Sequence, residues 1–223
     1  MLQYKHICNK VAIMFIHTLR SINHRIQKVS SDSNKLNNIR NDECNLVVWE
    51  RSLSLPILEY VNELLYSTKF RSIMIPSDER EKLYYNLPIT SSEGRTPFIE
   101  DLLQLLWLYK EATGQHNPKI HLTTILAMQC PLFHVDFNQV RLLCTYHGPG
   151  TLWLEEPNTD RSHLGCGHND HVVKDWDQIR QTNTGDVALL KGERYPGNMG
   201  YGIVHKSPEV PKETKRLFLR IEC

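Results

Sequence analysis

The sequence predicts an α+β domain, and the order of its elements is the main evidence. Two segments with apolar residues at helical spacing come first, and a series of short segments with alternating or continuous apolar residues follows. Turn sequences rich in Gly and Pro separate the later segments, as in folds built from many short strands. We therefore expect N-terminal helices packed on a double-stranded β-helix, a barrel of the jelly-roll or cupin-like type.

The composition indicates an ordinary globular chain. It has 223 residues, 40% hydrophobic and 23% charged, with a net charge of +1. A balanced charge gives no reason to expect a nucleic acid as partner, and no apolar run is long enough for a membrane span. A small molecule or a protein remains open as the substrate, and the oligomeric state cannot be predicted.

We predict two parts in the chain. Residues 1–41 form a basic N-terminal extension and linker, because an apolar patch at 11–16 lies among basic residues and 30–41 is rich in Ser, Asn and Asp. The patch lacks the cleavage site of a secretion signal, and a start at Met14 is an alternative. Residues 42–223 form one globular domain, with a helical part to residue 117 and the barrel beyond. Six scattered cysteines without a CxxC pair indicate reduced thiols and a cytoplasmic location.

In the helical part, NLVVWE at 45–50 predicts a strand, and Ser54 followed by Pro56 predicts the start of a helix. Residues 71–88 contain two prolines and are expected to be irregular or short-helical. The second helix is expected to begin at Thr96-Pro97 and to end at Gly114, with Glu100 and Asp101 near the positive end of its dipole. Its predicted apolar face consists of Ile99, Leu102, Leu103, Leu106 and Trp107.

After Pro118 the periodicity changes from helical to alternating, which predicts strands. The predicted strands are 120–128, 140–146, 151–154, 187–191, 201–205 and 216–222.

Within the barrel, three residues form a candidate metal site. His134 and Asp136 are two positions apart, so on an extended backbone their side chains point to one face. His205, at the end of a later strand, is the expected third ligand. Two His and one carboxylate with open positions form the facial triad of non-haem Fe(II) oxygenases, although zinc and manganese also accept these ligands.

The last predicted strand carries two arginines. Arg216, Phe218 and Arg220 share one face, while Leu217, Leu219 and Ile221 share the other. An arginine on the inner face of a barrel needs an anion, because a buried unpaired charge is costly. The carboxylate of an organic acid would pair with it in a bidentate manner.

These motifs resemble the iron- and 2-oxoglutarate-dependent oxygenases: His134-x-Asp136, the RLLCTY strand, the strand that begins at Gly185-Asp186, His205, and an Arg eleven positions later. The resemblance implies that Fe(II) is bound by His134, Asp136 and His205. It also implies that Arg216 binds the far carboxylate of 2-oxoglutarate, with Arg220 as the competing candidate. Tyr146 and Arg141 are candidate contacts of the metal ligands or the cosubstrate.

A second resemblance is more specific. VVWER, CPLFHVD, RLLCTYHGPGTLWL, GDVALLKGE, PGN, HKSP and RLFL, spread over residues 45–222, resemble a bacterial family known as domain of unknown function 1826. That family has no assigned reaction. The loop HLGCGHNDH at 163–171 is richer in ligand-type residues than the resemblance leads us to expect.

Other functions remain open from the sequence. A zinc site at His163, Cys166, His168 and His171 would fit a non-catalytic, zinc-handling protein, whereas a solvated surface loop is the simpler interpretation. Cys130 near His134 could be a nucleophile, but cysteines such as Cys130 and Cys144 are more often buried and unreactive. A barrel that binds a sugar or another ligand without metal is a third possibility.

Overall fold

The computed structural model describes residues 25–223. The first elements of the chain are β1 (Ile26–Ser30), η1 (Ser33–Arg40), β2 (Cys44–Trp49), α2 (Leu55–Tyr66), β3 (Ser72–Pro76), η2 (Ser77–Lys82), α3 (Leu83–Asn86) and α4 (Arg95–Thr113). They are followed by β4 (Lys119–Ile125), β5 (Val140–His147), β6 (Leu152–Trp153), η3 (Glu156–Asn158), η4 (Arg161–His163), α5 (Asn169–Val172), η5 (Trp176–Gln178), β7 (Arg180–Gln181), β8 (Val187–Lys191), β9 (His205–Lys206) and β10 (Arg216–Glu222).

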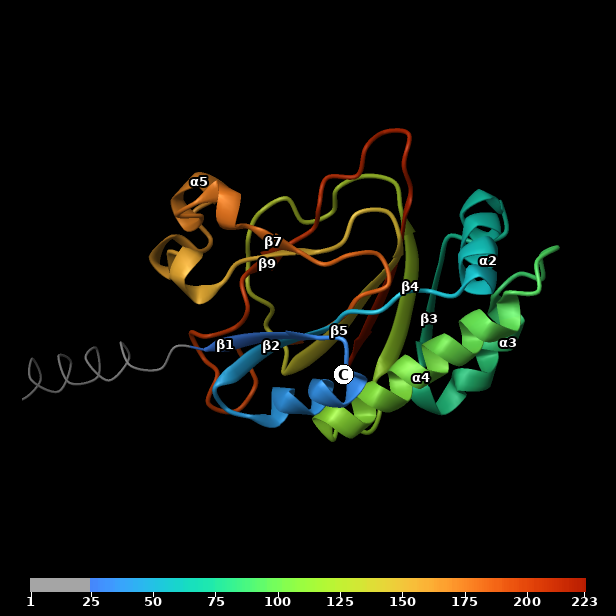
Figure 1. Ribbon diagram of the computed structural model, residues 1–223, viewed down its shortest axis with the longest axis horizontal. Helices are drawn as coiled ribbons and strands as arrows, with labels where there is room; N and C mark the ends of the chain where they lie inside the picture. The colour runs from blue at the N-terminus through green and yellow to red at the C-terminus, as the bar shows by residue number, and fades with distance from the viewer. Residues whose placement is uncertain (1–24) are drawn as a thin grey trace, which may run out of the picture.

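Two sheets organise the chain. The larger has seven strands in the order β1-β2-β8-β5-β10-β4-β3, and the smaller has three in the order β7-β6-β9. The β1–β2 pair is parallel and the other paired strands are antiparallel. Helices α2, α3 and α4 lie together at one end, and α5 lies at the other (Figure 1). The predicted α+β class is confirmed.

The seven-stranded sheet has two different faces. Strand β10 shows this by alternation: Leu217, Leu219 and Ile221 are fully buried in the core cluster that also contains the apolar residues of α2 and α4. Phe218 packs instead on a second cluster between the sheets, which includes Trp153 of β6. One face therefore supports the helices, and the other faces the smaller sheet. The predicted division of β10 into two faces agrees with this arrangement.

A buried ion pair fastens α4 to the larger sheet. Arg51 lies just after β2, and its Nη1 and Nη2 atoms pair with the two carboxylate oxygens of Asp101 on α4. Its Nε donates to the Gly185 carbonyl at 2.8 Å. The Tyr146 hydroxyl donates to the same carboxylate. Asp101 was expected to be a dipole-stabilising charge at the start of the helix, but it lies in the second turn and is buried. Its role is to neutralise Arg51.

The N-terminal segment differs from its prediction. Residues 30–41 were expected to be a flexible linker, but η1 buries Leu36 and Ile39 to 1% exposure within the main core. Asp32 caps η1 by accepting from the Asn34 amide at 2.9 Å, and β1 pairs with β2. Two apolar residues three positions apart were enough to anchor a polar segment. Residues 1–24, including most of the predicted basic extension, lie outside the described part of the chain.

Smaller differences concern element ends and exposure. Strand β3 forms where an irregular segment was predicted; it is an edge strand, which tolerates Pro76 at its end. Helix α4 begins one residue before Thr96, with Gly94 as its N-cap. Trp107, placed on the apolar face by prediction, is 59% exposed. No helix within residues 25–223 is long and apolar enough to cross a membrane.

Candidate functional site

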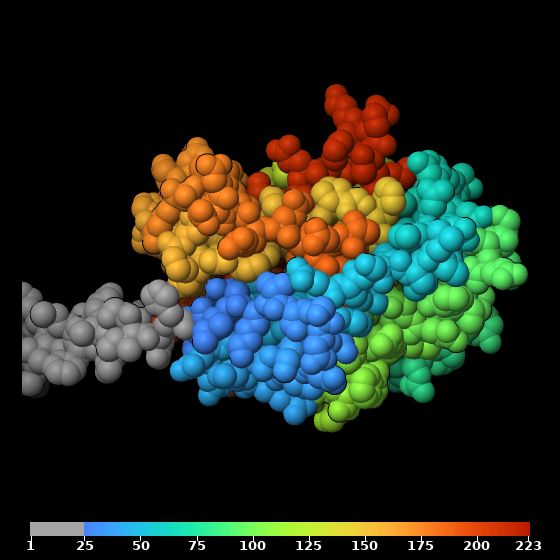
Figure 2. Space-filling model, in the orientation of Figure 1, coloured from blue at the N-terminus to red at the C-terminus, as the bar shows by residue number. Residues whose placement is uncertain are grey.

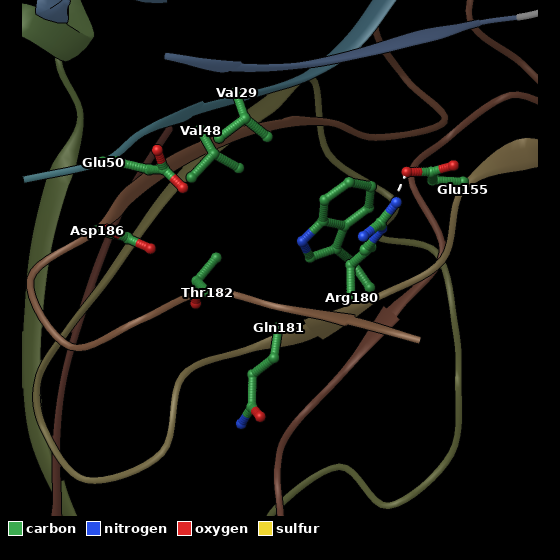
Figure 3. A pocket seen from close by; sticks show the side chains of 9 residues that line it. Val29, Val48, Glu50, Glu155, Arg180, Gln181, Thr182 and Asp186 are labelled. Atoms are coloured by element: carbon green, nitrogen blue, oxygen red, sulfur yellow. Dashed lines mark hydrogen bonds and ion pairs between the residues drawn. The ribbon is translucent and has the colours of Figure 1, made fainter. Parts of the chain in front are cut away.

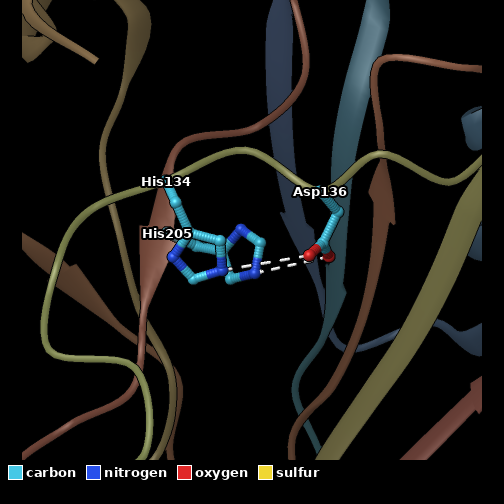
Figure 4. A group of neighbouring side chains, drawn as sticks. All are labelled: His134, Asp136 and His205. Atoms are coloured by element: carbon cyan, nitrogen blue, oxygen red, sulfur yellow. Dashed lines mark ion pairs between the residues drawn. The ribbon is translucent and has the colours of Figure 1, made fainter. Parts of the chain in front are cut away.

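Three side chains converge between the two sheets. One ligand atom from each of His134, Asp136 and His205 lies within 4.8 Å of the others. The His134 Nε2 atom is 3.9 Å from Asp136 Oδ1, and His205 Nε2 is 3.5 Å from Asp136 Oδ2. The side chains point toward one another (Figure 4). The backbones of the two histidines also exchange hydrogen bonds, of 3.0 and 2.9 Å, which hold the imidazoles side by side.

Backbone carbonyls orient both imidazoles. His134 Nδ1 is 2.9 Å from the Leu132 carbonyl, and His205 Nδ1 is 3.1 Å from the Ile203 carbonyl. A carbonyl only accepts, so each Nδ1 carries the proton and each Nε2 presents a lone pair toward Asp136. Burial lowers the pKa of His205, although the Asp136 carboxylate opposes this effect. The neutral form, which is the metal-binding form, is therefore favoured.

Asp136 is held by Arg141 but keeps binding capacity. Arg141 Nη1 is 2.5 Å from Asp136 Oδ2, and its Nε and Nη2 bind Glu222 Oε2 at 2.7 and 2.6 Å. The contact with Asp136 is an ion pair, and the buried Oδ2 atom has no hydrogen-bond partner. A buried carboxylate oxygen with a free lone pair beside two imidazole Nε2 atoms has the right donor set for a divalent metal ion.

The loop after β8 clamps the ligand segments together. The Glu193 amide donates to the Asp136 carbonyl at 2.9 Å, while Glu193 Oε1 accepts from the Gly202 amide at 2.9 Å, three residues before His205. Gly192 is required here because a Cβ atom would lie 2.7 Å from the Asp136 carbonyl oxygen. Sequence reasoning missed Glu193, although the KGE motif around it was recognised as part of the resemblance.

Arg216 is a buried cation without a carboxylate. Its side chain is 1% exposed, and Nη2 donates to the hydroxyls of Thr145 at 2.9 Å and Thr151 at 3.0 Å. Its guanidinium lies 4.1 Å from the ring centroid of Phe218, and Nε has no partner. Burial lowers the pKa of Arg216 to about 10. No carboxylate within residues 25–223 forms an ion pair with it, so the charge lacks an anion.

The structure distinguishes Arg216 from Arg220, which the sequence alone could not do. Arg220 Nε lies 2.9 Å from Glu222 Oε1, and its Nη2 is 3.4 Å from His121 Nδ1. Its side chain is 36% exposed. Arg220 thus has a carboxylate partner and is partly exposed to solvent, whereas Arg216 has no carboxylate partner and is buried.

A small cavity adjoins both the imidazoles and the threonine that holds Arg216. Its volume is about 70 Å³. The lining residues that matter here are His134, His205, Arg141, Thr151 and Phe218. An organic acid in this cavity would be close to the triad at one end and to the Thr151–Arg216 pair at the other.

Tyr146 does not join the site. The even-numbered residues of β5, including Cys144 and Tyr146, pack in the core beneath the helices, whereas Arg141 and Leu143 line the cavity. The alternation of a strand places Tyr146 on the face opposite Arg141. Burial raises the pKa of Cys144 to about 12, so that thiol is inert. Cys130 is exposed and lines the cavity, but within the described residues no hydrogen bond joins it to His134.

A larger cavity of about 360 Å³ lies between β1–β2 and the smaller sheet. Figure 3 shows Glu50, Asp186 and the Glu155–Arg180 ion pair around it. Trp153 also lines it and is paired with His205 across the β6–β9 ladder. Paired residues of neighbouring strands point to the same face, so the side chains of Trp153 and His205 lie on one face of the smaller sheet.

Comparison with solved structures agrees with the fold. A full-length protein of Neurospora crassa, in complex with alpha-KG and 5-formyluracil, matches over 91% of this chain and 85% of its own, with a TM-score of 0.50 and 12% identity. A prolyl-4-hydroxylase of Pseudomonas putida matches over 85% of this chain and 96% of its own, with a TM-score of 0.43 and 11% identity. No curated protein matches the sequence.

Fold and site together define an α+β protein whose fold is similar to that of the Neurospora crassa protein and which has a candidate His-Asp-His metal site. The family model described as protein of unknown function DUF1826 matches residues 30–222. The chain belongs to this family. The resemblance noted from its sequence motifs is thereby confirmed.

Proposed function

We propose that this protein is an oxygenase that uses Fe(II) and 2-oxoglutarate, and that its two facing sheets form a double-stranded β-helix. The observation that carries the proposal is Arg216, a buried cation without a carboxylate, in the same inter-sheet space as two imidazoles and one carboxylate. A metal site alone would fit many functions. A metal site with a separate buried anion site fits a cosubstrate that chelates metal at one end and carries a carboxylate at the other.

His134, Asp136 and His205 would hold the metal. The carbonyls of Leu132 and Ile203 favour the tautomer with the proton on Nδ1, so each neutral imidazole would offer Nε2 to the metal. Arg141 positions the Asp136 carboxylate and shares its charge with Glu222. When bound, Fe(II) with 2-oxoglutarate would supply oxidation of a substrate C–H bond by O₂, while the protein binds and orients the reactants.

Arg216 would bind the distal carboxylate of 2-oxoglutarate. Its Nη2 is already directed by Thr145 and Thr151, and its unpartnered Nε remains a donor. An incoming carboxylate would replace no existing ion pair and would neutralise the buried charge. The substrate would occupy the 360 Å³ cavity beside Trp153, which is large enough for a small molecule or a protein side chain.

The test is an anaerobic titration of the metal-free protein with Fe(II) and then 2-oxoglutarate, followed by visible absorption. We expect a weak charge-transfer band for the chelate, and we expect the band to be lost in His205→Ala and in Asp136→Ala. Arg216→Met should lose the band as well. Arg220→Met is the matched control for Arg216→Met, because Arg220 is on the same face of β10 but is paired with Glu222. The Arg220→Met protein should keep the band.

The competing function is a non-catalytic metal-binding protein. Tight zinc binding by the triad without any affinity for 2-oxoglutarate would favour it and would overturn the oxygenase proposal. A protein that binds neither metal would leave the third possibility, a barrel that binds its ligand without metal.

A further inference from the structure

A second group of metal-binding side chains lies on the loop between η4 and α5. His163, Cys166, His168 and His171 fall within nine residues, in the pattern H-x₂-C-x-H-x₂-H. The Cys166 Sγ atom is 3.9 Å from His171 Nδ1. The other two imidazoles also lie near His171: the ring centroid of His171 is 5.4 Å from that of His163 and 5.5 Å from that of His168. The loop therefore gathers four ligand-type side chains around His171.

The distances fit a site that closes on binding. A thiolate and an imidazole on one zinc ion, at about 2.3 and 2.0 Å, lie roughly 3.5 Å apart, close to the observed Cys166–His171 separation. Within residues 25–223, only His134, Asp136 and His205 have three ligand atoms mutually within 4.8 Å. The loop ligands are exposed, so the remaining imidazoles can approach by rotation of their side chains. Gly165 and Gly167 both have positive φ and form the tight turn that presents Cys166.

A carboxylate orients one of the imidazoles. Asp160 Oδ2 is 3.2 Å from His163 Nδ1, which leaves His163 Nε2 for a metal. A carboxylate on the far nitrogen of a metal-binding histidine is a common feature of zinc sites.

The loop is anchored to the segment that carries His134. The Asn169 side chain accepts from the Phe133 amide at 2.8 Å and donates to the Pro131 carbonyl at 2.9 Å. Val172 and Phe133 belong to one small core cluster. The segment around α5 forms an exposed lobe, away from α2 and α4 (Figures 1 and 2). Order in this loop is thus transmitted to the residue next to His134.

We propose that His163, Cys166, His168 and His171 bind one zinc ion, and that this structural site stiffens the segment Pro131–His134. The soft thiolate and the imidazoles select zinc rather than Fe(II). A Cys–His₃ set around Zn²⁺ is closed, with no open position for a substrate. The site shares no ligand with the triad.

The experiment uses full-length protein, stripped of metal and then dialysed against Zn²⁺ or Co²⁺. The His134→Ala protein, which lacks the triad, should still bind one equivalent of zinc. With cobalt it should show a thiolate-to-metal charge-transfer band in the near ultraviolet. Cys166→Ser in the same background should lose the band, and His171→Ala should lose the equivalent of zinc. Cys223→Ser, at another exposed cysteine, is the matched control and should change neither.

Two outcomes would overturn the proposal: a His134→Ala protein that binds no zinc, or a cobalt–thiolate band that survives Cys166→Ser. The triad is tested separately by measuring Fe(II) binding to the single variant Cys166→Ser, in which His134 is intact. Loss of the loop site should weaken Fe(II) binding without abolishing it. If iron binds normally but the loop binds no zinc, only the zinc proposal fails.

Discussion

Arg51 and Arg216 are both buried beside the seven-stranded sheet, but their surroundings are opposite. Arg51, on the helix side, is paired with Asp101 through both terminal nitrogens. Burial tends to lower the pKa of Arg51, but Asp101 more than compensates and raises it. Arg216, on the inner side, has two hydroxyls and an aromatic ring, and burial lowers its pKa to about 10. The neutralised charge of Arg51 therefore fits a structural role, whereas the charge of Arg216, which lacks an anion, fits the binding role proposed for it.

The largest effect is expected on the helix side. Arg51→Met leaves the Asp101 carboxylate buried without its cation and should lower the free energy of unfolding by about 3–5 kcal/mol, measured by urea denaturation. Because replacing both charges removes the uncompensated group, the double variant Arg51→Met/Asp101→Leu should be more stable than Arg51→Met. Equal or greater destabilisation in the double variant would show that the pair itself, and not the orphaned charge, dominates.

The opposite result is expected for Arg216. Arg216→Met removes a desolvated charge that has no carboxylate, so the free energy of unfolding should stay the same or rise by about 1 kcal/mol. In the wild-type protein, 2-oxoglutarate with metal at a hundred times its Kd should add about 2.7 kcal/mol; the variant should gain nothing from 2-oxoglutarate. A loss of stability as large as that of Arg51→Met would make Arg216 a structural residue.

Lys191 provides a third buried cation and the smallest expected effect. Its Nζ donates to the Asn41 carbonyl at 2.7 Å and lies 3.9 Å from the Tyr195 ring centroid. Burial lowers the pKa of Lys191 to about 8. The folded state therefore binds this proton less tightly than the unfolded state, so the charged form costs stability below pH 8. That cost disappears as the pH rises from 8 past the unfolded value.

Lys191→Met lacks this titration. Relative to the variant, the wild-type protein should gain roughly 2 kcal/mol of unfolding free energy between pH 7.5 and 9.5, measured by urea denaturation at both pH values. The groups that face Lys191 are Tyr195, Cys44, Asp42 and Arg25; they are present in both proteins, so the comparison removes most of their contribution. A difference that does not change with pH would contradict the lowered pKa.

Much of the fold could be predicted from local patterns. Strands β5, β8 and β10 were placed within a residue of their ends, because apolar residues of a buried strand bounded by turns are a strong signal. The segment Ser33–Arg40 could not be predicted, because only Leu36 and Ile39 reach the core and their polar neighbours dominate the composition. Strand β3 depends on pairing with β4, a contact that is not local.

The candidate site was predicted in part. His134, Asp136 and His205 were chosen by spacing and resemblance, and the structure brings them together; metal binding stays a proposal. The choice between Arg216 and Arg220 needed the burial of Arg216 and its contacts with Thr145 and Thr151, which depend on how β10 pairs with β5. Tyr146 and Arg141 were both candidate contacts of the site, but the structure places them on opposite faces of β5, because alternate residues of a strand face opposite ways. The Glu193 carboxylate accepts hydrogen bonds from the backbone amides of Gly200 and Gly202, and backbone amides leave no side-chain pattern in the sequence.

The paired backbone hydrogen bonds of His134 and His205 have a consequence for folding. About seventy residues separate the two histidines, so their contact closes a long loop and can form only after the intervening strands have paired. Metal affinity should therefore appear late during refolding and in a single step. Iron capture would then serve as a kinetic marker for the completed chain topology rather than for local order.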